Sequence, residues 1–305
     1  MVKRRRWKSK LQVRGVIMKK VVKFGGSSLA NAEQFQKVGD IIRSDESRRY
    51  VVPSAPGKRF DEDIKVTDML YGCYDAASKG EDITEKINAI KARYYEIIKG
   101  LGLSLSLEEE FKKIDEDFRA QAGIQYAASR GEFLNGKIMA AYLGYDFVDA
   151  ASVIRFDKAG NLEAEETNKL LSKKLSKSQH AVIPGFYGAC ADGTVKTFSR
   201  GGSDVTGSLV AKAIHADIYE NWTDVSGFLV TDPRIVHNPE PIEAITYREL
   251  RELSYMGATV LHEDAIFPVR KEGIPINIRN TNSPEDKGTL IVESTCKKPK
   301  FTITG

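Results

Sequence analysis

The sequence has few of the residues that build disulfide-bonded or metal-binding proteins. It holds only three cysteines, Cys73, Cys190 and Cys296, which lie far apart and in no metal-ligand spacing. An odd number of scattered cysteines argues against a disulfide framework and is typical of a reducing cytosol. No apolar run approaches the roughly 20 residues that span a bilayer. We therefore expect a cytoplasmic protein with no membrane partner.

Histidine is scarce as well, with four in the whole chain. His215, His237 and His262 share no ligand spacing, so we predict no metal centre built from protein ligands. The sequence also lacks internal repeats, heptads and low-complexity tracts. A chain of 305 residues can bury a substantial core, and it fits one large α/β domain or two lobes.

The formal net charge of +4 comes from one short segment at the start of the chain. Residues 1–17 contain no acidic residue, and without them the net charge becomes −3. Their basic residues are Lys3, Arg4, Arg5, Arg6, Lys8, Lys10 and Arg14. Such a segment could bind nucleic acid, but it lacks the apolar core of a secretory signal. We favour an upstream extension with no role in the fold, because Met18 directly precedes the first predicted strand, and we do not expect nucleic acid as a partner.

The amino-terminal pattern predicts a parallel sheet. Val21–Phe24 has the composition of a buried strand, residues 31–43 have helical periodicity, and Tyr50–Pro53 has the composition of a second strand. A strand, a helix and a second strand form a βαβ unit, whose two strands run parallel. Residues 67–143 are almost wholly helical in pattern and predict a helical insertion or cap on this sheet.

The remaining elements continue the α/β pattern. Glu249 three residues after Thr246 matches a capping box at a helix start. We predict strands at 145–148, 181–184, 218–222, 274–278 and 289–292, a hairpin over 185–198, and helices at 205–214, 246–256 and 260–271.

Two glycine-rich loops predict phosphate chemistry. Residues 197–204 place Arg200, two glycines, Ser203 and Asp204 just before a predicted helix, and residues 21–28 place Lys23 before Gly25 and Gly26. Glycines let the backbone approach an anion, and the N–H groups of a helix start point at it. Two such loops indicate transfer of a phosphoryl group, which needs cations and backbone donors around the moving group.

Each of these residues also has a plainer interpretation. Lys23 could be a surface lysine before a tight turn. Asp204 could simply cap a helix, or it could orient Lys23 or hold Mg²⁺ through water. Asp224 follows a predicted strand, where ligands of α/β sheets gather, but its segment could be an ordinary turn. Glu132 lies in a predicted helix, where a glutamate is usually solvated.

Taken together, these loops resemble the aspartokinases of the amino-acid kinase superfamily. The resemblance runs from Met18 to about Val292, and its landmarks come in the family's order. They are KFGGSS at 23–28, VVPSAPG at 51–57, VTDML at 66–70, SRGEFLNGK at 129–137, FSRGGSDVTG at 198–207, WTDVSG at 222–227, TDPR at 231–234 and MGATVLH at 256–262.

The resemblance implies that ATP phosphorylates the β-carboxylate of L-aspartate, which gives 4-phospho-L-aspartate and ADP. This reaction is the first step towards lysine, threonine and methionine. The implied fold is α/β, a three-layer, carbamate kinase-like arrangement with a mostly parallel sheet between helices. Residues 18–200 would form an amino-acid-binding lobe, with the helical insertion at about 61–143, and residues 201–296 a nucleotide-binding lobe. ATP and Mg²⁺ are the expected cofactors, and a homodimer is compatible with the resemblance.

Residue roles follow from the matching positions. Lys23 and Asp204 are the expected catalytic residues, with Lys23 stabilising the transferred phosphoryl group. Glu132 would bind the substrate ammonium and Arg200 its carboxylate. The other expected aspartate contacts are Ser54, Thr67 and Ser203, and the expected ATP contacts are Lys23, Gly25, Gly26, Ser27, Thr223, Asp224, Leu229 and Arg234.

Some positions depart from the family pattern. Leu229 stands where the family often has a tyrosine, Thr259 where it has a lysine, and Glu263 where it has a proline. These changes affect details of the nucleotide site. Residues 297–305 resemble the beginning of a link to regulatory domains, so we expect a catalytic part that lacks feedback inhibition.

Two alternatives remain. The first is another amino-acid kinase, acting on glutamate, acetylglutamate or carbamate, which the long helical segment around Glu132 disfavours. The second is a non-catalytic protein that binds RNA or senses amino acids, against which the presence of Lys23, Arg200 and Asp204 argues.

Overall fold

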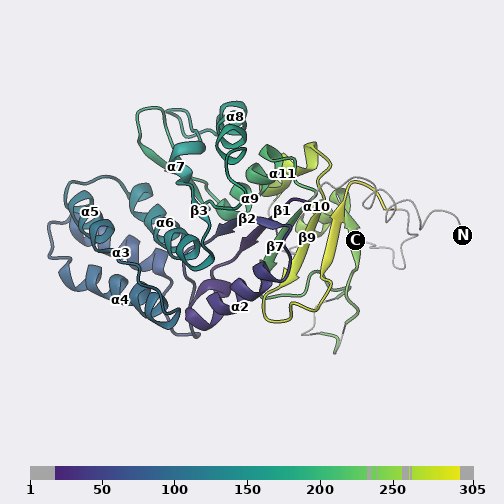
Figure 1. Ribbon diagram of the computed structural model, residues 1–305, viewed down its shortest axis with the longest axis horizontal. Coiled ribbons are helices and arrows are strands. Elements are labelled where there is room, and N and C mark those ends of the chain that lie inside the picture. The colour runs from purple at the N-terminus through teal and green to yellow at the C-terminus, as the bar shows by residue number, and fades with distance from the viewer. Residues whose placement is uncertain (1–17, 232–234, 238, 256–260, 262, 296–305) are drawn as a thin grey trace, which may run out of the picture.

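The protein is described from a computed structural model, in which the described residues are 18–231, 235–237, 239–255, 261 and 263–295 (Figure 1). Predictions for the basic segment 1–17, for Arg234 and Thr259, and for the segment 297–305 lie outside them. None of the helices within these residues is long and apolar enough to cross a membrane.

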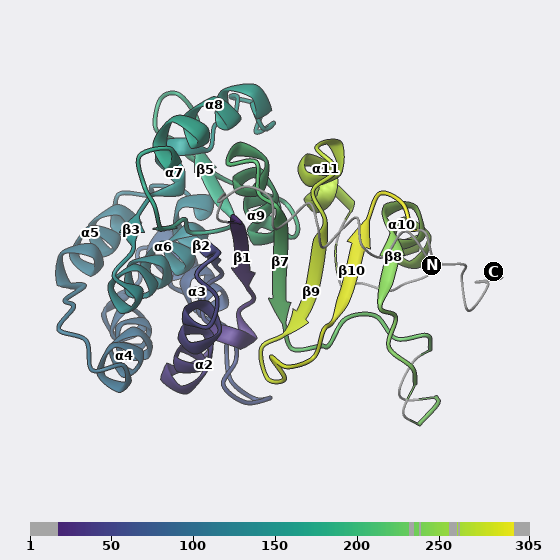
Figure 2. The same ribbon diagram turned by 45° about the vertical axis from the view of Figure 1, so that its right-hand side comes forward.

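A single large sheet forms the centre of the molecule, with helices on both faces (Figures 1 and 2). Its strand order is β3-β4-β2-β1-β7-β9-β10-β8. The strands are β1 (Lys20–Phe24), β2 (Arg48–Pro53), β3 (Asp146–Phe147), β4 (Ala181–Val182), β7 (Ile218–Thr223), β8 (Ala244–Thr246), β9 (Ile276–Asn280) and β10 (Thr289–Val292). All neighbours pair in parallel except β9 and β10, which are antiparallel. The predicted mostly parallel sheet between helices is therefore confirmed.

The predicted βαβ unit consists of β1, α2 (Ala32–Arg43) and β2. The side chain of Asn31 caps α2 by accepting a hydrogen bond from the Gln34 amide at 2.9 Å. Phe35 and Val38 of α2 are buried under the sheet. The 3.6-residue spacing of these apolar side chains explains why this segment is helical.

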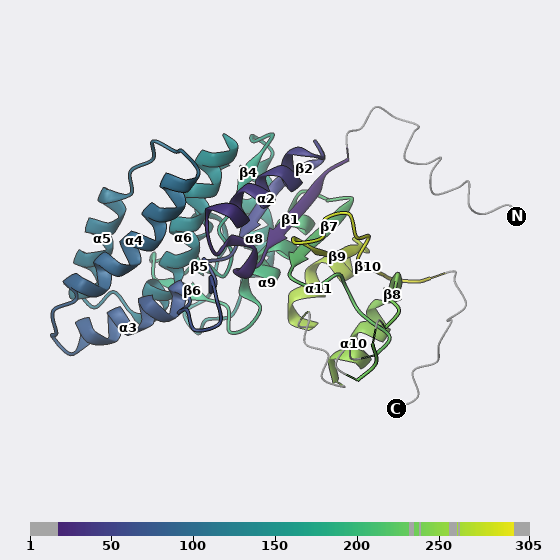
Figure 3. The ribbon, with the colours of Figure 1, turned by 90° about the horizontal axis from the view of Figure 1, so that it is seen from below.

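The helical character predicted for residues 67–143 is also confirmed. Four helices follow one another: α3 (Val66–Ser78), α4 (Thr84–Gly100), α5 (Glu108–Arg119) and α6 (Ile124–Leu143). Figure 3 shows them side by side beyond one end of the sheet. Buried Tyr94 and Phe111 join α4 to α5, with their ring centroids 6.1 Å apart, and α6 connects the group to β2 and β4.

Most of the remaining predicted elements are present with shifted bounds, and a few elements were not predicted. The predicted hairpin forms a separate two-stranded sheet of β5 (Tyr187–Ala189) and β6 (Val195–Thr197), and the helix expected at 205–214 is α9 (Gly202–Ala213). The capping box at α10 (Tyr247–Tyr255) is confirmed, since the Thr246 amide donates to Glu249 Oε2 at 2.6 Å. The helix predicted from 260 is described as α11 (Glu263–Lys271). Helices α7 (Ala150–Val153) and α8 (Ala164–Leu175), and strand β8, were not predicted.

Alternate residues of the central strands face two different cores. Val21 and Tyr219 belong to the core that contains α9, whereas Val22, Phe24 and Trp222 belong to the core that contains α2 and the four-helix group. Successive side chains of a strand point to opposite faces. Lys23 therefore shares the face of Val21 and points towards α9, which places the lysine between the sheet and that helix.

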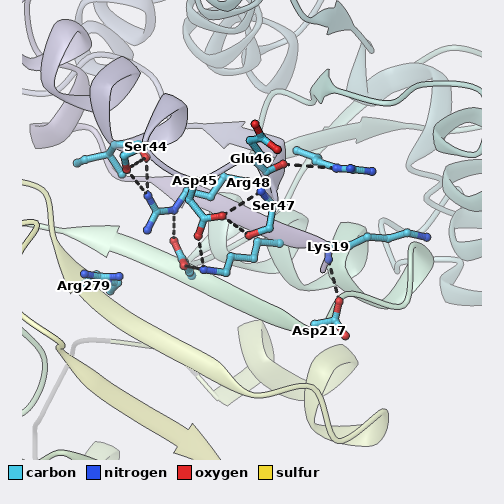
Figure 4. A network of polar contacts seen from close by, with 12 residues as sticks. Lys19, Ser44, Asp45, Glu46, Ser47, Arg48, Asp217 and Arg279 are labelled. Carbon is cyan, nitrogen blue, oxygen red and sulfur yellow. Dashed lines mark hydrogen bonds and ion pairs between the residues drawn. The ribbon is translucent and has the colours of Figure 1, made fainter. Parts of the chain in front are cut away.

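A buried network of charges fills the amino-terminal end of the central strands, away from the loops that follow them (Figure 4). Glu220 of β7, 1% exposed, accepts a hydrogen bond from Arg48 Nε at 2.8 Å and pairs with Lys20 at 3.0 Å. Lys20 also reaches Asp45 at 2.6 Å. Burial opposes ionisation, but the Arg48 and Lys20 cations hold the pKa of Glu220 below its usual range. These pairs cross-link β1, β2 and β7.

Candidate active site

Four parallel strands end at the same edge of the sheet and carry the predicted site loops there. Gly25 follows β1, Ser54 follows β2, Gly185 lies shortly after β4, and Asp224 follows β7. Because these neighbouring strands run in one direction, their carboxyl ends form a common rim. Ligands of open α/β sheets bind at such rims, so this edge is the candidate active site.

Lys23 and Asp204, the two expected catalytic residues, are in contact at this rim. Lys23 Nζ lies 2.8 Å from Asp204 Oδ1, and both side chains are largely buried. Asn221, the direct neighbour of Lys23 across the β1–β7 pairing, donates its amide to the same oxygen at 2.9 Å. Asp204 lies in the first turn of α9, where the helix dipole favours a negative charge. A cation and an anion are thus held beside the glycine loop.

The glycine loop after β1 is tied to both neighbouring strands. The Gly25 amide donates to the Trp222 carbonyl at 3.1 Å, and the Gly26 carbonyl accepts from the Gly57 amide at 2.8 Å. A Cβ on Gly26 would lie 3.0 Å from the Ala55 carbonyl oxygen, which is closer than an ordinary van der Waals contact. The two loops are therefore packed too closely for a side chain at this position. Ser27 is exposed and begins the short helix η1 (Ser27–Leu29).

The second glycine loop begins α9. Gly201 is the N-cap with φ of 55°, a left-handed conformation that suits glycine. Ser203 is buried against Gly185, where a Cβ would lie 2.5 Å from Ser203 Oγ. Arg200 precedes this turn and is exposed. Within the described part of the chain Arg200 makes no ion pair, and its role as a carboxylate clamp stays a prediction.

The predicted substrate residues Ser54, Thr67 and Glu132 come together from three elements. Glu132 of α6 is 6% exposed, and its Oε2 atom has no hydrogen-bond partner among the described residues. Thr67 is the second residue of α3, and its hydroxyl lies 3.8 Å from where a Cβ on Gly131 would stand. The Ser54 carbonyl accepts from Asn135, one turn after Glu132, at 2.6 Å. Glu132 is therefore not a solvated helical glutamate.

Burial dominates the ionisation of Glu132. It raises the pKa of this carboxyl to about 8, although a backbone hydrogen bond from Ala55 and the charge of Arg130 act in the opposite direction. A buried acid without a paired cation is costly to ionise. The side chain is thus suited to pairing with a cation that a ligand brings.

The predicted nucleotide contacts lie farther along the rim. Thr223 ends β7 and donates to Asp224 Oδ1 at 3.1 Å, and Asp224 is exposed. Leu229, 38% exposed, forms an isolated bridge with Pro241. Arg234 lies outside the described residues. None of the three described residues forms a hydrogen bond or ion pair with Lys23 or Asp204, so their nucleotide roles stay predictions.

Sequence reasoning missed two residues that organise this rim. Asn221 holds Asp204, and its only sequence signal is an amide inside an otherwise buried strand. Arg93 of α4, 5% exposed, donates to the Gly57 carbonyl at 3.0 Å and pairs with Asp63 at 2.8 Å. Nothing in the local pattern of a predicted insertion helix indicates that its arginine supports a distant loop.

The arrangement can hold an anionic group and a cationic group at the same rim. The Lys23 ammonium and the remaining backbone amides of the glycine loop can donate hydrogen bonds to phosphate oxygens, while Glu132 can accept hydrogen bonds from an ammonium group. No group of three or more histidine, cysteine, aspartate or glutamate side chains in the described ranges could enclose a metal ion.

Comparisons with known proteins agree with this geometry. Residues 18–280 match the model of the amino acid kinase family. Aspartokinase 3 of Bacillus subtilis is 40% identical over 289 residues, which cover 90% of this chain and 63% of that protein. The crystal structure of Clostridium acetobutylicum aspartate kinase has 53% identity and a TM-score of 0.88, over 92% of this chain and 64% of that one.

A third similar protein was crystallised with ligands. E. coli aspartokinase III in complex with aspartate and ADP has 28% identity and a TM-score of 0.78, over 91% of this chain and 65% of that one. The chain thus spans just under two thirds of the length of the relatives compared. The match to the family model covers most of the residues, from β1 through β9. This chain therefore belongs to the amino acid kinase family.

Proposed function

We propose that the protein transfers the γ-phosphoryl group of ATP to the β-carboxylate of L-aspartate, which gives 4-phospho-L-aspartate and ADP. The observation that carries the proposal is the Lys23–Asp204 pair, 2.8 Å apart, between the glycine loop and the start of α9. The names of the relatives support aspartate as acceptor, since three of them are aspartokinases. The residues present also match the charges of aspartate, which has one ammonium and two carboxylates.

In this proposal each side chain has a separate task. Glu132 binds the ammonium of aspartate, and Arg200 binds its α-carboxylate as a planar, two-pronged donor. Ser54, Thr67 and Ser203 supply neutral hydrogen bonds. The β-carboxylate is already a nucleophile, so no strong general base is required. Lys23 places its positive charge on the transferred phosphoryl group, whose charge is spread over its oxygens.

The nucleotide is held by the opposite part of the rim. Gly25 and Gly26 let the loop backbone approach its phosphates, and the amides of Gly26 and Ser27 donate to them. Thr223, Asp224, Leu229 and Arg234 are the further proposed nucleotide contacts. Residues 18–200 would then form the amino-acid lobe and residues 201–296 the nucleotide lobe. A homodimer stays a prediction.

Magnesium fits the oxygen donors of this rim. Mg²⁺ usually keeps several waters and takes one or two carboxylates together with substrate phosphates. Asp204 is a partly exposed carboxylate beside the expected phosphate position, so it could hold the ion through water. When bound, the ion would neutralise charge on the phosphates.

One assay tests the acceptor. The protein is incubated with ATP, Mg²⁺, L-aspartate and hydroxylamine, which traps an acyl phosphate as a hydroxamate. We expect aspartyl hydroxamate to form at the rate of ADP release. Parallel reactions contain glutamate, acetylglutamate or carbamate in place of aspartate. Product from one of these acids, and none from aspartate with a folded sample, would overturn the assignment.

A further inference from the structure

Asn221 is an amide in a largely buried strand, β7, and its side chain contacts the candidate site. It pairs directly with Lys23 across β1 and β7, so both side chains leave the sheet on the same face. The neighbours of Asn221 on that face, Tyr219 along β7 and Ile278 across β9, belong to the core. Asn221 is 3% exposed. A polar side chain so deeply buried needs a partner to offset its desolvation.

Its partner is the carboxylate of Asp204. Asn221 Nδ2 donates to Asp204 Oδ1 at 2.9 Å, and Lys23 Nζ contacts the same oxygen at 2.8 Å. Asp204 therefore has two anchors, one charged and one neutral. The Oδ1 atom of Asn221 has no hydrogen-bond partner among the described residues, so the side-chain amide bonds to the site through Nδ2.

The two anchors differ in what they can do during the reaction. The Lys23 ammonium has three donors, so it can contact Asp204 and phosphate oxygens at the same time. Its positive charge is then shared between the two anions, and its hold on Asp204 weakens. Asn221 is neutral and fixed in the sheet, so it can hold the carboxylate without competing for the negative charge of the phosphates.

We propose that Asn221 is a positioning residue, which keeps Asp204 in place while Lys23 engages the transferred phosphoryl group. The proposal rests on the proposed phosphoryl transfer. The effect of Asn221 is therefore greatest in the transition state, where Lys23 engages the phosphoryl group most fully, and the proposal predicts a larger change in turnover than in substrate binding.

The first test replaces Asn221 with leucine, which is similar in size and cannot hydrogen-bond. Loss of one hydrogen bond to a charged group predicts a fall in kcat of about 10- to 100-fold. We expect the KM values for aspartate and ATP to stay within about twofold of the wild type. Should the Asn221→Leu protein fail to fold, Asn221→Ser, whose hydroxyl is too short to reach Asp204, replaces it with the same expected result.

Asn277 provides a matched control on the neighbouring strand. It pairs with Glu220, so it lies on the opposite face of the sheet from Asn221, and its Oδ1 atom is also buried with no hydrogen-bond partner in the described part of the chain. Asn277→Leu should leave kcat unchanged. A kcat of Asn221→Leu within twofold of the wild type, or an equal loss in Asn277→Leu, would overturn the proposal. So would a raised KM at constant kcat, which would indicate ligand binding.

A second measurement does not depend on the acceptor. Urea unfolding of the wild type, Asn221→Leu, Asp204→Ala and the double variant forms a thermodynamic cycle. We expect Asn221→Leu to lower stability less when Asp204 is absent, because the two residues share one interaction. Strict additivity would refute the pairing. If the wild type fails with aspartate but phosphorylates another acid, the proposed acceptor is wrong, and the kcat comparison is made with that acid.

Discussion

The amide of Gly57 donates a hydrogen bond to the carbonyl of Gly26 at 2.8 Å, which joins the loops after β2 and β1. The close approach of these two loops leaves no room for a side chain at Gly57. A Cβ on Gly57 would lie 2.6 Å from the Gly26 carbonyl carbon and 2.8 Å from the Ser27 nitrogen. Both contacts are with backbone, which cannot move aside as a flexible side chain can. The glycine loop expected to bind phosphate thus depends on a second glycine in the neighbouring loop.

Gly57→Ala should therefore displace the glycine loop. Such overpacking costs about 1–3 kcal/mol of stability, and we expect a larger proportional loss of kcat/KM for ATP than for aspartate. Urea unfolding and steady-state kinetics measure the two effects. Gly72→Ala in α3 is the control, since its Cβ would meet nothing within 4 Å, and alanine stabilises a helix interior by about 0.5–1 kcal/mol. Wild-type kinetics in Gly57→Ala would contradict the prediction.

Lys23→Met removes the charge beside the glycine loop and keeps much of the side-chain volume. Removal of one preorganised electrostatic group typically lowers kcat by about 10²–10³-fold, and we expect a loss of this size here. Circular dichroism and the melting temperature show whether the fold is kept. Lys37→Met, on the outer face of α2 where Lys37 pairs with Glu33, should be as active as the wild type. A turnover of Lys23→Met near that of the control would remove Lys23 from the mechanism.

The sequence predicted those parts of the fold whose signals are local. The βαβ unit around α2, the helical segment with Glu132 and the capping box at Thr246 each have a pattern within a few residues, and the structure contains all three. Strand β8 has three residues, which is too short for alternation to appear. The antiparallel direction of β10 against β9 depends on where the chain returns to the sheet, and no local pattern specifies this.

The same distinction between local patterns and long-range contacts applies to the candidate site. Lys23, Asp204 and Glu132 could be selected because charged residues beside glycines, or within a family-like motif, stand out in the sequence. Their environment could not be predicted. That Glu132 is buried and not solvated, and that Asn221 shares an oxygen of Asp204 with Lys23, follow from contacts between distant elements. Arg200 shows the opposite case, since its motif is clear but its side chain is exposed without a partner in the described ranges.

Glu220→Gln should destabilise the protein by about 3–5 kcal/mol, because it leaves buried Arg48 and partly buried Lys20 without their shared anion. The pKa of Glu220 is lowered in the folded protein. Ionised Glu220 therefore stabilises the protein at any pH above the pKa that this carboxyl has in the unfolded chain. This stabilisation is lost as the pH falls through the lower pKa of the folded state. Urea unfolding should show a steeper loss of stability below about pH 4 in the wild type than in the variant.

The control for Glu220 is Glu33→Gln, which alters an exposed pair with Lys37 on α2. Exposed ion pairs contribute about 0–1 kcal/mol, so this variant should unfold within about 0.5 kcal/mol of the wild type. Equal destabilisation by the two substitutions would show that the buried network contributes no more to stability than an exposed ion pair does.

Glu132 should release a proton when aspartate binds. Its pKa of about 8 in the folded protein means that most molecules carry the neutral acid at pH 7. The ammonium group of a bound aspartate would stabilise the carboxylate and lower this pKa, so the proton leaves. Aspartate should also bind more tightly as the pH rises from 7 to 8.5. Isothermal titration calorimetry in buffers of different ionisation enthalpy, with ADP present, counts the released proton.

The sign of the stability effect of Glu132 provides an independent check. A carboxyl whose pKa is raised on folding binds more protons in the folded state, so stability falls as pH rises from about 4.5 to 8 and then levels off. Glu132→Gln removes this slope, and its unfolding free energy should exceed that of the wild type by a margin that grows over this range. The same variant should release no proton with aspartate. Proton release that persists in Glu132→Gln would assign the ammonium contact to another residue.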